Sequence, residues 1–310
     1  MRITHRMLAQ SVTRNVRDNL LALEKKAVQL SSGRCFNRPS QDPAGTYKVM
    51  RITGTGLYRN EQYQRNIGEG ITWLTVTEDA LADAISIMQR LKELAVYAAN
   101  GTLTPEDRSM ISPEAEELFN HLVSIGNTEV GGLYIFGGYQ TQKPPYEKII
   151  NDPDDPNDPG VQYLGDAGQR EIEITPSQTL SINFTGIEVF GEPETEPSGT
   201  ELFQTVRKLE SALSSNDVEA LGGEILQEVD ARLDYLLQQR ARIGARMERL
   251  ESTEQRLQNE HIYLRELQSK IEDLDLAEAI TEFTMQENAY KAALATGARM
   301  IYPSLIDFLR

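Results

Sequence analysis

The sequence is poor in the residues and patterns that mark several large classes of protein. Its single cysteine, Cys35, excludes a disulfide within the chain. None of its three histidines lies in an HExxH pattern or near the cysteine, so the common zinc motifs are absent. No run approaches the roughly 18 apolar residues of a membrane span, and the N-terminal residues lack the apolar core of a secretory signal peptide. Taken alone, these absences favour a cytosolic protein.

Motifs for catalysis and for binding nucleotides or calcium are missing or incomplete. The sequence TGTG (53–56) lacks a third glycine at the required spacing and follows no predicted strand. The acidic stretch 151–160 partly resembles a calcium loop, but Pro159 replaces one ligand and Asp166 stands where a glutamate belongs. No GxSxG or Cys/His pattern occurs, and no spacing singles out a pair of catalytic carboxylates. We therefore expect no enzymatic activity, no cofactor and no metal site.

Positive charge is also in short supply. The chain has 31 Lys and Arg against 47 Asp and Glu, a net charge of −16. Such a balance opposes binding to phosphate backbones and to anionic membranes, so we expect neither nucleic acid nor membrane as a partner. The arginines in 240–249 have glutamates among them and after them, which is typical of a salt-bridged helix face.

A seven-residue repeat dominates the C-terminal half and predicts one long helix in a left-handed supercoiled bundle. The interleaved positions are partly polar, which places the second seam of this helix at the edge of the bundle. Gly244 costs about 1 kcal/mol relative to alanine in a helix, so we expect another helix to approach closely there. The apolar repeat positions are Val229, Leu236, Ile243, Leu250, Leu257, Leu264 and Ile271.

Both ends of the chain show apolar residues at spacings of three and four, the pattern of amphipathic helices. The N-terminal stripe consists of Leu8, Val12, Val16, Leu20, Leu23, Ala27 and Leu30. The C-terminal stripe consists of Leu276, Ile280, Phe283, Tyr290, Leu294, Ile301, Leu305 and Phe308. Pro303 is expected to kink or end the last helix.

The middle of the chain changes from helix to strand and back. A helix is predicted from about Pro43 to Ala99, and its glycines at 54, 56, 68 and 70 allow a break in the first half. Its clearest apolar stripe consists of Leu74, Leu81, Ile85, Met88, Leu91 and Ala95. A second helix begins either at Thr104-Pro105 or at Ser112-Pro113, and the sequence does not decide between them. Between 131 and 191, short alternating runs, IEVFG among them, predict small β-strands joined by turns.

The stretch SSGRCFNRPSQDPAG (31–45) separates two of these helices, and its prolines prevent a helix from running through it. It closely resembles the N-terminal signature of the bacterial flagellin family, in which LSSG is followed by NRPSxDPAG. Cys35 and Phe36 depart from the usual basic and aliphatic residues. The resemblance continues through NIGEGITWLTVTEDAL, ELAVYAANGT, RIGARMERLE and SKIEDLDLAEAITEFTMQENAYKAALA. The stretches GGLYIFGGYQTQKPPYE and MIYPSLIDFLR resemble the hook–filament junction branch of that family.

The resemblance implies a mainly α fold of the α+β class: an antiparallel coiled-coil bundle of long helices with a small all-β domain inserted between helices. Residues 1–42 and 272–310 would form an inner assembly domain, 43–130 and 194–271 a helical bundle, and 131–193 an outer β domain. The terminal stripes Leu8, Val12, Val16, Leu20, Leu23, Leu30, Ile280, Phe283, Leu294, Ile301, Leu305 and Phe308 would carry assembly. Asn37, Arg38, Pro39, Asp42 and Pro43 would connect the inner and outer domains, with charge-assisted contacts expected from Arg38 and Asp42. The same segment could also simply cap two helices.

The resemblance also implies a structural role in the bacterial flagellum, as an adaptor between hook and filament. Its partners would be further copies of itself in a ring, hook-associated protein 1, flagellin, and a cytosolic export chaperone at the C-terminal region. Export through the flagellar type III channel uses no cleaved signal, which would reconcile an extracellular location with a sequence that looks cytosolic. Two alternatives are a flagellin filament subunit and a cytosolic coiled-coil protein with a β binding module.

Overall fold

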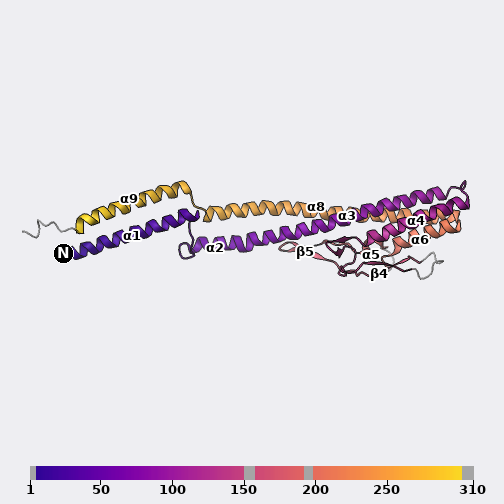
Figure 1. Ribbon diagram of the computed structural model, residues 1–310, viewed down its shortest axis with the longest axis horizontal. Coiled ribbons are helices and arrows are strands. Elements are labelled where there is room, and N and C mark those ends of the chain that lie inside the picture. Colours follow the sequence, from indigo (N-terminus) through magenta and orange to yellow (C-terminus); the bar gives the residue numbers. More distant parts are fainter. Residues whose placement is uncertain (1–4, 150–157, 192–197, 302–310) are drawn as a thin grey trace, which may run out of the picture. The chain divides into compact units, whose positions relative to one another are not determined.

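The computed structural model of the chain, drawn in Figure 1, describes residues 5–149, 158–191 and 198–301. The backbone divides into two compact units. Unit 1 comprises residues 1–61 and 259–310, and unit 2 comprises residues 62–258. Two long helices, α3 (Tyr58–Ala98) and α8 (Glu224–Glu272), have residues in both units. The mainly α fold with a small β part, predicted from the sequence, is confirmed.

Unit 1 contains the terminal helices and the segments that connect them to the rest of the chain. Its elements are α1 (His5–Ser32), α2 (Pro43–Arg51), the π-helical turn η1 (Ile52–Leu57) and α9 (Leu276–Ile301), with the start of α3 and the end of α8. In Figure 1, α1 and α9 lie side by side and run in opposite directions. Gly54 and Gly56 lie in a π-helical turn within a continuous helical stretch, so the helix is not broken there.

Unit 2 contains most of α3 and α8 and the shorter elements between them. Its other helices are α4 (Pro105–Gly126), α5 (Gly186–Phe190), α6 (Glu201–Ser215) and α7 (Val218–Gly222). Six strands in the described residues form three antiparallel pairs. These are β1 (Glu129–Val130) with β2 (Leu133–Tyr134), β3 (Tyr146–Lys148) with β4 (Val161–Tyr163), and β5 (Glu171–Thr175) with β6 (Gln178–Ser181).

The core of unit 2 lies along the apolar seams of its helices, as the periodicity predicts. On α8 the repeat positions from Val229 to Leu257 are all buried. On α3 the buried positions include every residue of the predicted stripe: Leu74, Leu81, Ile85, Met88, Leu91 and Ala95. The expectation of a close helix approach at Gly244 is wrong: a Cβ built there would meet no atom within 4 Å. That glycine faces open space because the buried seam passes through its neighbour Ile243.

Helix α4 begins at the first of the two predicted start signals. The Thr104 side chain accepts a hydrogen bond from the amide of Asp107, and the Asp107 carboxylate accepts one from the amide of Thr104. This reciprocal capping box satisfies two amides that the helix itself cannot use. Pro113 lies inside α4, at a place where the sequence offered an alternative start.

The stretch IEVFG, predicted as a strand, instead forms the short helix α5, so that prediction is wrong. Thr185 accepts a hydrogen bond from the amide of Glu188, and the Glu188 carboxylate accepts one from the amide of Thr185. Val189 and Phe190 are buried. A capping box thus outweighs the strand preference of the β-branched and aromatic residues.

The β segment and the helices of unit 2 share one hydrophobic core. Tyr146 and Phe190 from the segment pack against Phe203 of α6, with ring centroids 4.9 and 5.5 Å apart. Arg246 of α8 lies 4.2 Å from the ring centroid of the buried Phe184 and donates to the carbonyl of Ser181 at 3.1 Å. The three-domain division expected from the sequence remains a prediction. The shared core indicates that the folding of the β segment and of the helices is coupled.

This coupling predicts a large effect for Phe184→Ala. Removing a fully buried phenylalanine should lower the free energy of unfolding of unit 2 by about 3–5 kcal/mol. In urea titrations, the far-UV helix signal and the fluorescence of Trp73 should both shift to lower urea. Tyr97→Ala is the control, because that ring is 56% exposed and its loss should cost less than about 0.5 kcal/mol. If Phe184→Ala shifted the Trp73 fluorescence transition but left the far-UV helix transition at the same urea concentration, the coupling would be contradicted.

Candidate assembly interface

The terminal helices α1 and α9 pack against each other through a narrow seam. As the residue number rises along α1 it falls along α9: Val12 lies against Gly297, Asn19 accepts a hydrogen bond from Gln286, and Lys26 pairs with Glu282. A Cβ placed on Gly297 would lie 2.7 Å from Cγ1 of Val12, so only glycine permits this approach. The antiparallel pairing of the two ends, implied by the resemblance, is therefore present in the structure.

The seam uses only part of each predicted apolar stripe. Of the predicted residues, Val12, Val16, Leu23, Leu30 and Phe283 are half-buried. Leu20, Ile280 and Leu294 point outward, with exposed fractions of 46%, 56% and 44%. The side chains of Leu8 and Ile301 are not described, although both residues lie within helices. Leu305 and Phe308 lie outside the described residues.

Further apolar side chains join the exposed group on the same two helices. They are Met7, Leu21 and Val28 on α1, and Leu276 and Met285 on α9. Of these, the sequence stripes include only Leu276, because the stripes follow the best single helical face. The small residues in the seam, Ala279 and Gly297 among them, are buried instead. Each terminal helix therefore has one face on its partner and a second apolar face open to solvent.

The connector between α1 and α2 is a pair of helix caps, as one of the two sequence-based interpretations proposed. Gly33 ends α1 in the left-handed region, with φ +70°, and its amide donates to the carbonyl of Gln29. Asp42 begins α2, where its side chain accepts from the amide of Gly45 at 2.9 Å and Pro43 occupies the first turn. Asn37 donates to the hydroxyl of Ser32 at 2.8 Å. Arg38 and Pro39 are exposed.

The connector is also hydrogen-bonded to the end of α8 and to the segment between α8 and α9. The amide of Cys35 donates to the carbonyl of Glu272 at 2.8 Å, and the amide of Leu274 donates to the carbonyl of Gly33 at 2.9 Å. Arg34 lies 2.8 Å from the buried carboxylate of Glu272. The sequence suggested charge-assisted contacts for Arg38 and Asp42. In the structure Asp42 binds a backbone amide, and Arg34 forms the connector's ion pair with Glu272.

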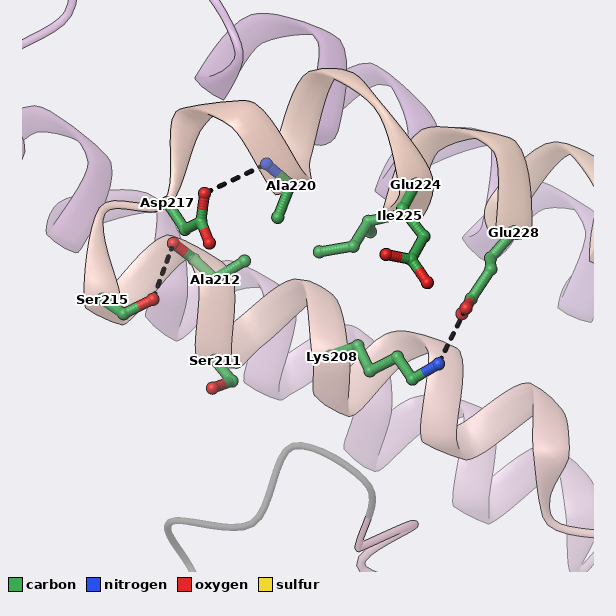
Figure 2. A pocket seen from close by; sticks show the side chains of 9 residues that line it. All are labelled: Lys208, Ser211, Ala212, Ser215, Asp217, Ala220, Glu224, Ile225 and Glu228. Carbon is green, nitrogen blue, oxygen red and sulfur yellow. Dashed lines mark hydrogen bonds and ion pairs between the residues drawn. The ribbon is translucent and has the colours of Figure 1, made fainter.

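A hollow of about 370 Å³ in unit 2 is lined by residues from Lys208 to Glu228 (Figure 2). Two of its charged groups engage elements of the fold: Lys208 of α6 reaches Glu228 of α8 at 2.7 Å, and Asp217 caps α7 through the amide of Ala220. Among the described residues, no group of three or more His, Cys, Asp or Glu could hold a metal ion. No helix in the described part of the chain is long and apolar enough to cross a bilayer.

Two family profiles match the chain, and between them they include the segments that form both terminal helices. The bacterial flagellin N-terminal helical region matches residues 3–141, and the bacterial flagellin C-terminal helical region matches residues 226–309. Together they span well over half of the sequence. The chain belongs to the bacterial flagellin family. Membership also identifies it as a structural protein and not an enzyme.

Individual members of the flagellin family are similar to the chain over nearly its whole length. The flagellar hook-associated protein 3 of Escherichia coli (strain K12) is 25% identical, over 94% of this chain and 95% of its own. The hook-associated protein 3 of Salmonella typhimurium is 24% identical over the full length of both. The flagellin of Bacillus subtilis is 29% identical, over 95% and 94%.

Solved structures share the fold. A flagellar hook-associated protein from Vibrio parahaemolyticus has a TM-score of 0.65 at 19% identity, covering 75% of this chain and all of that one. The flagellar junction protein FlgL from Legionella pneumophila has a TM-score of 0.59 at 19% identity, covering 74% and 100%. At these sequence identities the structural similarity supports the fold alone.

The one-sided packing of α1 and α9 predicts uneven hydrogen exchange. A helix of about 30 residues with a single partner is marginal in water, because most helical stability comes from buried faces. In a verified monomer, amides in 5–32 and 276–301 should exchange quickly, whereas the buried stretches of α3 and α8 in unit 2 should be protected. In assembled flagella the terminal helices should become protected as well. Strong protection of both ends in the monomer would contradict this.

The connector bridge predicts that two neighbouring arginines differ in importance. Arg34→Met leaves the buried carboxylate of Glu272 without its cation and should lower the stability of unit 1 by about 1–2 kcal/mol. Arg38→Met is the matched control, since Arg38 is exposed, and its effect should stay within about 0.5 kcal/mol. Thermal unfolding followed by circular dichroism measures both, and equal effects would argue against the bridge.

Proposed function

We propose that this chain is the subunit that joins the hook of the bacterial flagellum to its filament. The observation that carries the proposal is its similarity to hook-associated protein 3 over nearly the whole chain, which extends well beyond the terminal helices common to the family. The flagellum is its location, and other flagellar components are its partners. The specific partners are part of the proposal: further copies of itself, hook-associated protein 1 on the hook side and flagellin on the filament side.

The exposed apolar faces of α1 and α9 are the proposed assembly surface. Fully burying a leucine or isoleucine side chain contributes about 1.5–3 kcal/mol, so a handful of such residues is enough to order a marginal helix pair. In a lone chain Leu20, Ile280 and Leu294 remain in water. Neighbouring subunits would cover them, and the ends of the chain would then be stable only in the assembly.

Export completes the proposal. A chain that passes through a narrow channel must be largely unfolded, and the single cysteine means that no internal disulfide has to be broken or formed. A cytosolic chaperone at the C-terminal region would shield the apolar face of α9 before export. We propose that the protein leaves the cell through the flagellar type III channel, without a cleaved signal peptide.

Flagellin is the second candidate, because the flagellin of Bacillus subtilis shares 29% identity with the chain. A filament subunit must stack on itself without limit through an interface that never closes. A junction subunit is needed in few copies and must present different surfaces to hook and filament. The two roles therefore predict different defects when the gene is deleted.

Deletion of the gene should leave hooks intact and export active, with flagellin released into the medium because nothing retains it. Electron microscopy of the cells and immunoblots of the supernatant measure the two effects. Normal filaments on the deleted strain would overturn the proposal. Bare hooks without released flagellin would favour the filament role instead, in a cell that has no second flagellin.

Point variants connect this phenotype to the proposed surface. Leu20→Asp or Leu294→Asp would place a charge on the apolar face that neighbouring subunits bury. Either variant should fail to complement the deletion. Met110→Asp is the matched control, because Met110 is 78% exposed and belongs to α4 of unit 2, whereas the terminal helices belong to unit 1. It should restore filaments. Loss of function in all three variants alike would remove the support for the terminal helices.

A further inference from the structure

The turn between α3 and α4 contains an asparagine with a glycine after it, and in the whole sequence only Asn100 is followed by glycine. An asparagine can lose ammonia when the amide nitrogen of the next residue attacks its side-chain carbonyl carbon and closes a five-membered succinimide ring. A side chain on that next residue hinders ring closure, so glycine permits it most readily. Asn100, Gly101 and Thr102 are all exposed to solvent, which supplies the water that opens the ring.

The hydrogen bonds of the turn prepare Asn100 for this reaction. Its side-chain oxygen Oδ1 accepts from the amide and from the hydroxyl of Thr102, at 3.2 and 3.1 Å. These two bonds fold the carboxamide back over the chain at Gly101, and they draw electrons from the carbon that is attacked. Among the described residues, no hydrogen bond is found for the amide of Gly101 or for Nδ2 of Asn100. The attacking nitrogen and the leaving nitrogen are therefore both available.

The main-chain carbonyl of Asn100 is held by a buried arginine. Arg108 of α4 is only 3% exposed, and its guanidinium donates to the carbonyl of Asn100 at 2.9 Å. It also donates to the carbonyl of Ala98 at 2.8 Å and to the side-chain oxygen of Asn216 at 2.6 Å. All three of these acceptors are uncharged. The cation is therefore well placed to stabilise negative charge that develops on the carbonyl oxygen of Asn100.

We propose that Asn100 is a site of spontaneous modification, at which the chain converts an asparagine to isoaspartate. Ring closure joins the amide nitrogen of Gly101 to the side-chain carbon Cγ of Asn100 and releases ammonia. Water then adds to the main-chain carbonyl carbon of residue 100 and breaks its bond to the nitrogen of Gly101, which stays attached through Cγ. The product has a free carboxylate where Arg108 donates. Water is the only reagent that the two steps consume.

Arg108 decides between the two ways in which the ring can open. Addition of water at Cγ would give ordinary aspartate, whereas addition at the main-chain carbonyl gives isoaspartate. The guanidinium stabilises the oxyanion of the second route, so isoaspartate is the favoured product. The conversion lengthens the main chain of the turn by a methylene carbon and adds a negative charge to unit 2. It is a reaction of the chain by itself and does not rest on the proposed function.

Incubation of the purified full-length protein at mildly alkaline pH tests the site, because alkali removes the proton from the attacking amide. Mass spectrometry after digestion with trypsin follows Asn100 in peptide 93–108 and the control Asn37 in peptide 35–48, each of which has a single asparagine. Asn37 is exposed as Asn100 is, but Arg38 follows it. Asn100 should lose its amide while Asn37 remains intact. Equal rates at the two asparagines, or no reaction at Asn100, would overturn the proposal.

Gly101→Ala tests the mechanism without disturbing the fold. A Cβ at position 101 would meet no atom within 4 Å, and the φ of Gly101 lies outside the left-handed region, so alanine fits there. The variant should lose the Asn100 amide about tenfold more slowly, which corresponds to a barrier higher by about 1.4 kcal/mol. An unchanged rate, in a variant whose thermal unfolding matches that of the original protein, would contradict attack by the Gly101 amide.

The ratio of isoaspartate to aspartate tests the role of Arg108. Fragmentation by electron transfer distinguishes the two products in peptide 93–108. The share of isoaspartate should be higher in the folded protein than in the same protein unfolded in guanidinium chloride, where Arg108 no longer lies at the carbonyl of Asn100. This comparison needs no substitution of the buried arginine. A share that is equal or lower in the folded protein would overturn the role of Arg108.

Discussion

The terminal helices of unit 1 are held together by the close contact between α1 and α9, and this contact depends on small side chains. Gly297 lies so near Val12 that a single added carbon would clash, and Ala279 is buried in the same seam. Close packing of small residues lets two helix backbones approach, but it buries little apolar surface per turn. Several larger residues of both helices, Leu20, Ile280 and Leu294 among them, remain exposed. A pair built in this way holds together yet stays incomplete until other subunits cover it.

The helices could be predicted from the sequence because their signals are long and periodic. The seven-residue repeat from Val229 to Leu257 marks the buried seam of α8, and the stripe from Leu74 to Ala95 marks that of α3. Every position of such a repeat predicts the same buried helix face, so one polar residue in it does not change the prediction. The assignment of the family came instead from the short connector, where prolines and glycines at fixed positions leave few alternative structures.

Three features could not be predicted, and each depends on a single local or tertiary contact. IEVFG has the composition of a strand, but the Thr185–Glu188 capping box makes it a helix. Gly244 has no neighbour, because helical period alone does not say which side of a glycine is open. The ion pair of the connector uses Arg34, since its partner Glu272 is 238 residues away in sequence and only the fold brings the two together. The separation of each terminal stripe into a seam and an open face likewise requires the structure.

Charge is divided between the two units in a way that suits an assembled protein. Unit 1 has sixteen Lys and Arg against thirteen Asp and Glu, whereas unit 2 has fifteen against thirty-four. Unit 2, which lacks the terminal helices, therefore has a net charge of −19, whereas unit 1 has one of +3. Self-repulsion of strongly acidic surfaces keeps separate copies soluble. The nearly balanced unit 1 imposes no such repulsion, so its exposed apolar faces can meet those of other copies. Assembly would thus be confined to unit 1 by the distribution of charge as well as by the distribution of apolar side chains.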